Sequence, residues 1–182
     1  MFPKIKLIFC CLALFVFVKA NAFNNSHYSK TDSLPYFLQN SQLPEIKGKI
    51  LSLTDGKTLP FNQNQLTGFR SYVIIYFNPE CGHCQIEAEN ISKNAAAFDN
   101  TLFLWLTYRG KKDDLMVFGE KYGIAKMPNS WVIQLSDYSV PAFYKIEFTP
   151  YIAVYNNQKQ WLQDFRKGAT PAEIIDLISA KP

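Results

Sequence analysis

Cysteine is scarce in this sequence: its 182 residues include four cysteines. Cys10 and Cys11 lie in an apolar segment near the N-terminus, which leaves Cys81 and Cys84 for the rest of the chain. A small domain that depends on disulfides for its stability needs many more cysteines than two. The chain is instead long and apolar enough to bury a core, with 48% hydrophobic and 15% aromatic residues.

The N-terminal apolar run is too short to span a membrane. It covers residues 7–18, or 12 residues, whereas a membrane-spanning helix needs roughly 20. Lysines precede the run, and the small residues of Ala20-Asn21-Ala22 follow it, which is typical of a secretory signal peptide. We therefore expect residues 1–22 to be removed before Phe23, with a periplasmic or other extracytoplasmic location; a retained membrane anchor is the alternative.

Excess basic charge is also nearly absent once this segment is set aside. The whole chain has a formal net charge of +4, and Lys4, Lys6 and Lys19 supply three of these charges, so residues 23–182 have a net charge of +1. No cluster of lysine and arginine remains in that part of the sequence. The composition therefore argues against a nucleic-acid partner.

Residues 23–42 are rich in Asn, Ser and Gln and predict a linker, whereas residues 43–182 predict one domain. In this domain, β-branched and aromatic runs alternate with segments of helical spacing, which predicts an α/β fold with a mixed central β-sheet flanked by helices. An Asp55-Gly56 turn between apolar runs predicts an N-terminal β-hairpin. The predicted elements are hairpins over 49–61 and 149–166, strands over 71–79, 101–108 and 130–135, and helices over 81–98, 112–122, 137–146 and 170–180.

The stretch FNPECGHC, residues 77–84, leaves three uses for its cysteine pair: a metal site, a structural disulfide or a redox centre. Structural zinc needs four ligands, and the only histidines are His27, in the linker, and His83, between the cysteines. A disulfide across so short a loop removes little chain entropy, so its structural benefit is small. The redox centre is the favoured interpretation, and no metal or other cofactor is expected.

The position of the pair assigns a role to each cysteine. Cys81 lies where a predicted buried strand meets a predicted helix, so unpaired N–H groups and the helix dipole favour its thiolate and make it the nucleophile. Cys84, one turn later, is placed to attack the mixed disulfide that Cys81 forms. Gly82 is interpreted as the residue that allows a tight turn, and protonated His83 as a positive charge beside the thiolate.

These features resemble the thioredoxin superfamily: FNPECGHC after a buried strand, Thr149-Pro150 opening a later strand, and a closing hairpin and helix. Within it, the Asp55-Gly56 hairpin, an extra element before Thr149 and Glu87 resemble the exported TlpA/ResA-like branch. The resemblance implies a thioredoxin-like fold over about residues 43–180. It also implies a cis Pro150 that presents the backbone of Thr149 to substrate, and a desolvated Glu87 with a raised pKa that exchanges protons with Cys84.

Two departures from this resemblance concern the redox direction. Thioredoxin has a buried aspartate six residues before its first cysteine, where this chain has Ile75, and an aromatic residue just before that cysteine, where this chain has Glu80. The charge of Glu80 disfavours the Cys81 thiolate, whereas the Gly-His insert resembles that of protein disulfide isomerases and favours an oxidising pair. The sequence therefore leaves the direction open, with a reductase as the preferred interpretation.

The sequence thus predicts an exported thiol-disulfide oxidoreductase, monomeric, that acts on protein thiols and disulfides. The resemblance implies that a membrane electron donor recharges it. Alternatives are a disulfide oxidase or isomerase, a copper-binding module and a protein-binding module with a vestigial cysteine pair. A peroxiredoxin-like peroxidase is disfavoured because Asn78 occupies the position, three residues before Cys81, where that site needs Thr or Ser.

Overall fold

The computed structural model describes residues 42–179. The predicted signal peptide and nearly all of the predicted linker lie outside these residues, as do Cys10, Cys11 and His27. Seven strands form one sheet in the order β2-β1-β5-β4-β3-β6-β7. The strands are β1 (Gly48–Leu51), β2 (Thr58–Pro60), β3 (Ser71–Tyr76), β4 (Thr101–Thr107), β5 (Ser130–Leu135), β6 (Tyr151–Asn156) and β7 (Trp161–Phe165). The helices are α2 (Gly82–Lys93), α3 (Lys112–Lys121), α4 (Ser139–Tyr144) and α5 (Pro171–Ser179), with short 3₁₀ turns at Gln63–Gln65, Ala95–Ala97 and Ile124–Lys126.

The sheet is mixed, as predicted. Strands β3, β4 and β5 are parallel neighbours, while β1, β2, β6 and β7 join antiparallel on either side. The run SYVIIY forms β3, and all six of its residues are buried, as a parallel strand covered on both faces requires. The predicted hairpin at Asp55-Gly56 is confirmed as the β1–β2 pair.

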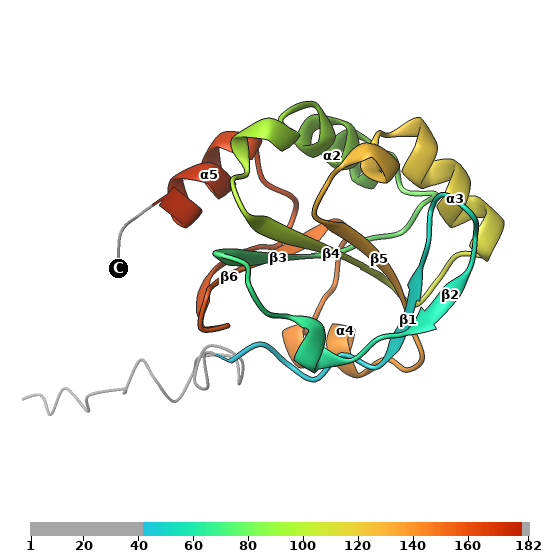
Figure 1. The fold of residues 1–182 in the computed structure, drawn as a ribbon, viewed down its shortest axis with the longest axis horizontal. Helices are drawn as coiled ribbons and strands as arrows, with labels where there is room; N and C mark the ends of the chain where they lie inside the picture. The colour runs from blue at the N-terminus through green and yellow to red at the C-terminus, as the bar shows by residue number, and fades with distance from the viewer. Residues whose placement is uncertain (1–41, 180–182) are drawn as a thin grey trace, which may run out of the picture.

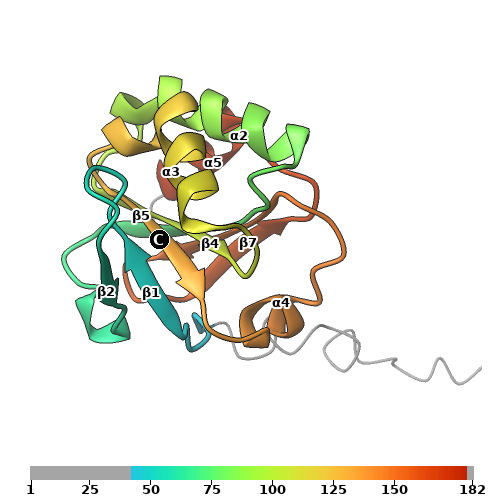
Figure 2. The ribbon, with the colours of Figure 1, turned by 90° about the vertical axis from the view of Figure 1, so that its right-hand side faces the viewer.

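Helices cover both faces of the sheet unequally. Helices α2, α3 and α5 lie on one side and α4 on the other (Figures 1 and 2). We call the first side the cysteine face; its buried cluster includes Val73, Ile75 and Phe77 of the β3 region together with Cys84 and Ile91 of α2. We call the second side the tyrosine face; its buried cluster includes Tyr72, Tyr76, Tyr144, Tyr151 and Tyr155.

Helix α5 begins at the predicted capping box. The Thr170 backbone N–H donates to Glu173 Oε2 at 2.7 Å, and the Glu173 N–H donates to Thr170 Oγ1 at 3.3 Å. These two bonds satisfy N–H groups that the first turn of a helix leaves unpaired. They fix the direction in which the chain leaves residues 167–169, a segment that contacts the cysteine site.

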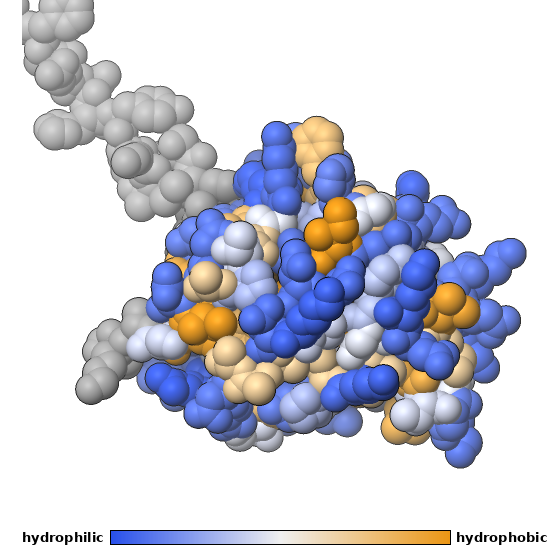
Figure 3. Space-filling model, turned by 90° about the horizontal axis from the view of Figure 1, so that it is seen from above, coloured by the Kyte–Doolittle hydropathy of each residue, from blue (hydrophilic) through white to orange (hydrophobic). Residues whose placement is uncertain are grey.

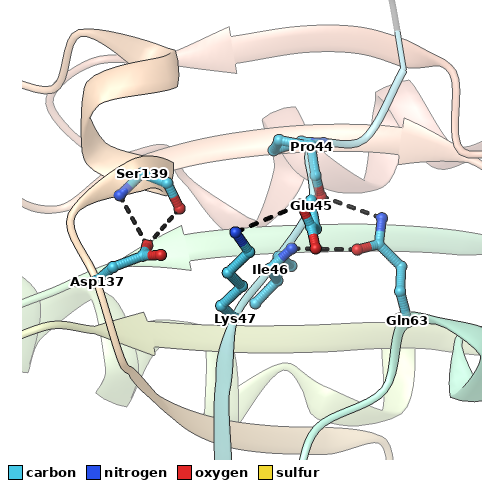
Figure 4. Close-up of polar contacts among 7 residues, drawn as sticks. All are labelled: Pro44, Glu45, Ile46, Lys47, Gln63, Asp137 and Ser139. Carbon is cyan, nitrogen blue, oxygen red and sulfur yellow. Dashed lines mark hydrogen bonds and ion pairs between the residues drawn. The ribbon is translucent and has the colours of Figure 1, made fainter.

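Hydrogen bonds fix the N-terminal segment against the tyrosine face. The Gln63 side chain donates to the Pro44 carbonyl and accepts from the Ile46 N–H, both at 3.1 Å. Nearby, Asp137 accepts from the Ser139 N–H at 3.0 Å (Figure 4).

The outer surface of α2, α3 and α5 is mostly hydrophilic with small hydrophobic spots (Figure 3). Among residues 42–179, every helix is too short or too polar to cross a bilayer.

Candidate functional site

The cysteine pair lies at the carboxyl end of β3, where the chain turns into α2. Cys81 is the N-cap residue, with extended φ and ψ of −82° and 118°, and its N–H donates to the Asn78 carbonyl at 3.0 Å. Pro79 lies in this turn, before the helix begins at Gly82. The Cys81 side chain is half-buried, and no disulfide joins it to Cys84.

The Cys81 thiol lies close to the start of β6. Its Sγ donates to the Thr149 carbonyl oxygen at 3.5 Å, although 68 residues separate the two. The predicted cis peptide bond between Thr149 and Pro150 is present. The fold therefore brings together three of the residues expected at the site, and the half-exposed sulfur of Cys81 lies beside the backbone segment that leads into β6.

The surroundings of Cys81 favour its thiolate. Burial alone would raise the pKa of the Cys81 thiol, but hydrogen bonding with the Cys84 N–H, the side chains of Thr149 and Cys84, and the His83 N–H outweighs it, so the pKa lies below the ordinary value. This confirms the expected effect of the helix N-terminus. The His83 ring is exposed, and the role predicted for its charge stays a prediction.

Cys84 has the opposite environment. It is fully buried in the cysteine-face cluster. Burial, and in smaller part the neighbouring Cys81 sulfur, raises the pKa of the Cys84 thiol to about 12. At neutral pH Cys81 is therefore the more reactive of the two, and Cys84 needs a proton acceptor before it can attack another sulfur.

Glu87 is a buried carboxyl one turn after Cys84, with 8% of its surface exposed. Its Oε2 accepts from the Ala169 N–H at 3.3 Å, and its Oε1 is buried without a hydrogen-bond partner. Burial raises the pKa of this carboxyl to about 7, and the Ala169 bond offsets only part of that effect. The predicted burial and raised pKa are confirmed, while proton exchange with Cys84 stays a prediction.

The interpretation of Gly82 as the residue that allows a tight turn is wrong. Gly82 is the first residue of α2, its φ is not left-handed, and a Cβ atom added there would meet no atom within 4 Å. The turn is made earlier, where the Asn78 side chain accepts from the Glu80 N–H at 3.2 Å and the Asn78 carbonyl from the Cys81 N–H.

Two residues that the sequence analysis did not assign support the site. Asn78 forms the turn just described, and an Asn that bonds the backbone two residues later is a recognisable turn signal. Gly168 has a φ of +89°, and a Cβ atom there would lie 2.5 Å from Glu87 Oε2 and 3.3 Å from Pro150. A side chain at 168 is thus excluded by conformation and by space, but the contact joins segments 81 residues apart and has no local signal.

No group of three or more His, Cys, Asp or Glu side chains within residues 42–179 is arranged to hold a metal ion. The groups at the site with a shifted pKa are instead the two thiols and one buried carboxyl. Such a set can carry out proton transfer and sulfur exchange.

Comparison with known proteins supports the fold. No protein-family model and no curated protein matches the sequence. Among solved structures, a secreted Mycobacterium tuberculosis disulfide oxidoreductase homologous to E. coli DsbE matches with a TM-score of 0.58 and 20% identity, over 73% of this chain and 95% of that one. A Corynebacterium glutamicum thiol-disulfide isomerase matches with a TM-score of 0.58 and 17% identity, over 79% of this chain and 100% of that one. A Plasmodium vivax 2-Cys peroxiredoxin matches with a TM-score of 0.61 and 16% identity, over 75% of this chain and 91% of that one.

These similarities establish the fold. The chain has an α/β thioredoxin-like fold, with a mixed seven-stranded sheet flanked by helices and an N-terminal β1–β2 hairpin. The three neighbours carry different names, so the shared fold does not distinguish among their activities.

Proposed function

We propose that the protein is a thiol-disulfide oxidoreductase that exchanges the Cys81/Cys84 dithiol and disulfide with cysteines of partner proteins. The asymmetry of the pair carries this proposal. Cys81 is half-exposed with a lowered pKa, whereas Cys84 is buried with a pKa of about 12. A structural pair needs no such difference in exposure and pKa. An exchange reaction needs one thiol that attacks the substrate first and a second thiol that later attacks the mixed disulfide.

The reaction in the reducing direction has two steps. The Cys81 thiolate attacks one sulfur of a substrate disulfide, a mixed disulfide forms, and the other substrate sulfur leaves as a thiolate that takes up a proton. Cys84 then loses its proton and attacks the Cys81 sulfur, which releases the second substrate thiol. The substrate gains two electrons and two protons, and the Cys81/Cys84 pair becomes a disulfide.

Glu87 and Thr149 have supporting roles in this proposal. Because the Glu87 carboxyl has a pKa of about 7, it can both accept and return a proton near neutral pH, which suits the step in which Cys84 must be deprotonated. The Thr149 backbone next to the Cys81 sulfur can pair with an extended substrate segment.

We propose reduction as the physiological direction, as the resemblance to the TlpA/ResA-like branch implies, with an exported location and a membrane electron donor that returns the pair to the dithiol. One observation favours the alternative of a disulfide oxidase or isomerase. The lowered pKa of Cys81 stabilises the reduced form as its thiolate, which makes a pair more oxidising. A glutathione redox titration of the purified protein separates the two: a potential near that of thioredoxin, about −270 mV, supports a reductase, and one near −120 mV supports an oxidase.

The test of the activity is reduction of a protein disulfide by the wild type and by Cys81→Ser. We expect the variant to lose the activity and Cys84→Ser to accumulate a mixed disulfide with the substrate. Equal rates for wild type and Cys81→Ser would refute the proposal. Parallel assays with hydrogen peroxide and with Cu(I) test the peroxidase and copper-binding alternatives on the same samples.

A further inference from the structure

A cavity of about 230 Å³ lies between the end of β3 and the segment that leads into β6. Its walls include Asn78 and Thr149, whose carbonyl oxygens accept the Cys81 N–H and the Cys81 thiol. An occupant of this cavity therefore contacts two residues that are hydrogen-bonded to Cys81. The proposed reaction assigns no role to the cavity.

The cavity is framed by segments that meet at the carboxyl end of the parallel strands. Tyr76 and Phe77 come from the end of β3, Arg109 follows β4, and Tyr138 lies between β5 and α4. Phe148, in the segment from α4 to β6, completes the wall; Figure 2 shows α4 and this segment beyond the ends of the strands. Ligands of α/β sheets bind at this end.

The aromatic residues here are exposed to an unusual degree. Among the described residues, three of the seven exposed large hydrophobic side chains are aromatic: Tyr108, Tyr138 and Phe148, with 49%, 53% and 59% exposed. Tyr138 and Phe148 line the cavity, and Tyr108 packs edge-to-face against Tyr138 with ring centroids 5.7 Å apart. Exposed aromatic groups gathered at one place commonly mark a binding surface.

Local contacts support three residues of the cavity wall. Asp137 and Ser139, on either side of Tyr138, are hydrogen-bonded to each other (Figure 4). The Arg109 N–H donates to the buried Thr107 hydroxyl at 3.1 Å. On the far side, Lys167 Nζ lies 5.8 Å from the centre of the Phe148 ring. These contacts hold the backbone around Tyr138 and Arg109 and one face of the Phe148 ring.

Size and chemistry together suggest the occupant. At about 230 Å³, the cavity is smaller than the roughly 300–1,000 Å³ that drug-sized ligands and cofactors occupy, but a single large side chain fits. Its aromatic walls favour another ring in an edge-to-face or offset arrangement, and Arg109 can lie over the face of such a ring. Glu147 also lines the cavity, so Arg109 is accompanied by an opposite charge and the site does not favour an anion.

We propose that this cavity binds one aromatic side chain of the substrate polypeptide, located within two residues of the reacting cysteine. This inference rests on the proposed function. An extended chain advances about 3.3 Å per residue, so a residue one or two positions from the cysteine reaches a cavity that begins at Thr149 while its cysteine lies at Cys81. The substrate class is thus a disulfide flanked by Phe, Tyr or Trp.

The test measures kcat/KM for reduction of short disulfide peptides that differ only in the residue next to each cysteine: Phe, Leu, Asp or Gly, on either side. We expect the Phe peptide to react about 10- to 100-fold faster than the Gly peptide, the usual range for filling an apolar pocket. Phe148→Ala should abolish this preference. Its ring is exposed and lies outside both buried clusters, so the variant should fold. Leu59→Ala, on exposed β2, is the matched control and should keep the preference.

Hydroxyethyl disulfide, which has no side chain to bind, separates this inference from the proposed function. Wild type and Leu59→Ala should reduce it equally. Failure of the wild type to reduce it would overturn the proposed function and this inference with it. With that activity present, equal rates for the Phe and Gly peptides, a faster Asp peptide, or a Phe preference that persists in Phe148→Ala would each overturn the inference alone.

Discussion

The two faces of the sheet bury ionisable groups with opposite consequences. On the tyrosine face, the hydroxyls of Tyr144 and Tyr155 are 2.5 Å apart, and the Tyr151 hydroxyl donates to Asp164 at 3.0 Å. Burial raises the pKa of all three tyrosines. Since an ordinary phenol has a pKa near 10, these groups stay neutral at every physiological pH, and their hydrogen bonds serve stability.

On the cysteine face the same physical effect brings one group, the Glu87 carboxyl, into the physiological pH range. Burial raises the pKa of Glu87 from 4.5 to about 7 and that of Cys84 to about 12, while Cys81 at the surface shifts downward. The Glu87 carboxyl also has an oxygen without a hydrogen-bond partner, which a purely structural group seldom has. What distinguishes the faces is therefore the starting pKa of the buried group and whether its hydrogen bonds are complete.

The largest expected difference between the faces is in catalysis. Cys81→Ser should remove disulfide reduction altogether, because a hydroxyl cannot replace the thiolate that attacks sulfur. Tyr155→Phe, on the opposite face, should keep the wild-type rate. Both are measured by initial rates of protein disulfide reduction. A rate lost equally in the two variants would mean that the assay reports folding and not the chemistry of one face.

The next largest effect concerns stability against pH. Glu87 has a raised pKa in the folded protein, so its contribution favours folding below pH 4.5, where the folded and unfolded states are both protonated. That contribution is lost as pH rises toward 7 because the unfolded state ionises first. A shift from 4.5 to about 7 corresponds to about 3 kcal/mol of unfolding free energy. Glu87→Gln should abolish this decline, measured by urea unfolding of the reduced protein at pH 5 and pH 8.

Glu89→Gln is the matched control for that experiment. Glu89 lies on the exposed side of the same helix and pairs with Lys93 at 2.6 Å; exposed pairs of this type contribute about 0.3–0.5 kcal/mol. This variant should keep the decline between pH 5 and pH 8. If Glu87→Gln declines as steeply as the wild type, Glu87 is not the group that titrates, and the contrast between the two faces fails.

The sequence predicted the bounds of β5 and the position of Glu87, because both depend on local spacing. The β5 strand was expected at residues 130–135 and is found at Ser130–Leu135, and Glu87 follows Cys84 by one helical turn, so its place near the pair could be inferred. The contact of Cys81 with Thr149 was expected from the family resemblance and not from spacing. The contact of Gly168 with Glu87 and the aromatic cavity, whose walls come from four segments, had no such signal. Local periodicity contains no information on which loops meet at a sheet edge.

Substitutions on the tyrosine face should change the free energy of unfolding and leave the rate of disulfide reduction unchanged. Tyr155→Phe removes the buried hydrogen bond with Tyr144 and should lower the free energy of unfolding by about 1–3 kcal/mol, by the same amount at pH 5 and pH 8, since no group that titrates in this range is removed. Urea unfolding at both values measures this. A loss that changes between pH 5 and pH 8 would show that the two faces are coupled.

The smallest effect is expected at Gly82, which lies between Cys81 and Cys84 and yet has the conformation of an ordinary helical residue. Because a Cβ atom there meets no atom within 4 Å and alanine favours the helix over glycine, Gly82→Ala should stabilise the protein by up to about 1 kcal/mol. Disulfide reduction should change little, because the N–H groups that stabilise the Cys81 thiolate come from His83 and Cys84. Unfolding in urea and initial rates measure the two effects. Loss of stability would restore the tight-turn interpretation, and loss of rate alone would place Gly82 in the path of the substrate.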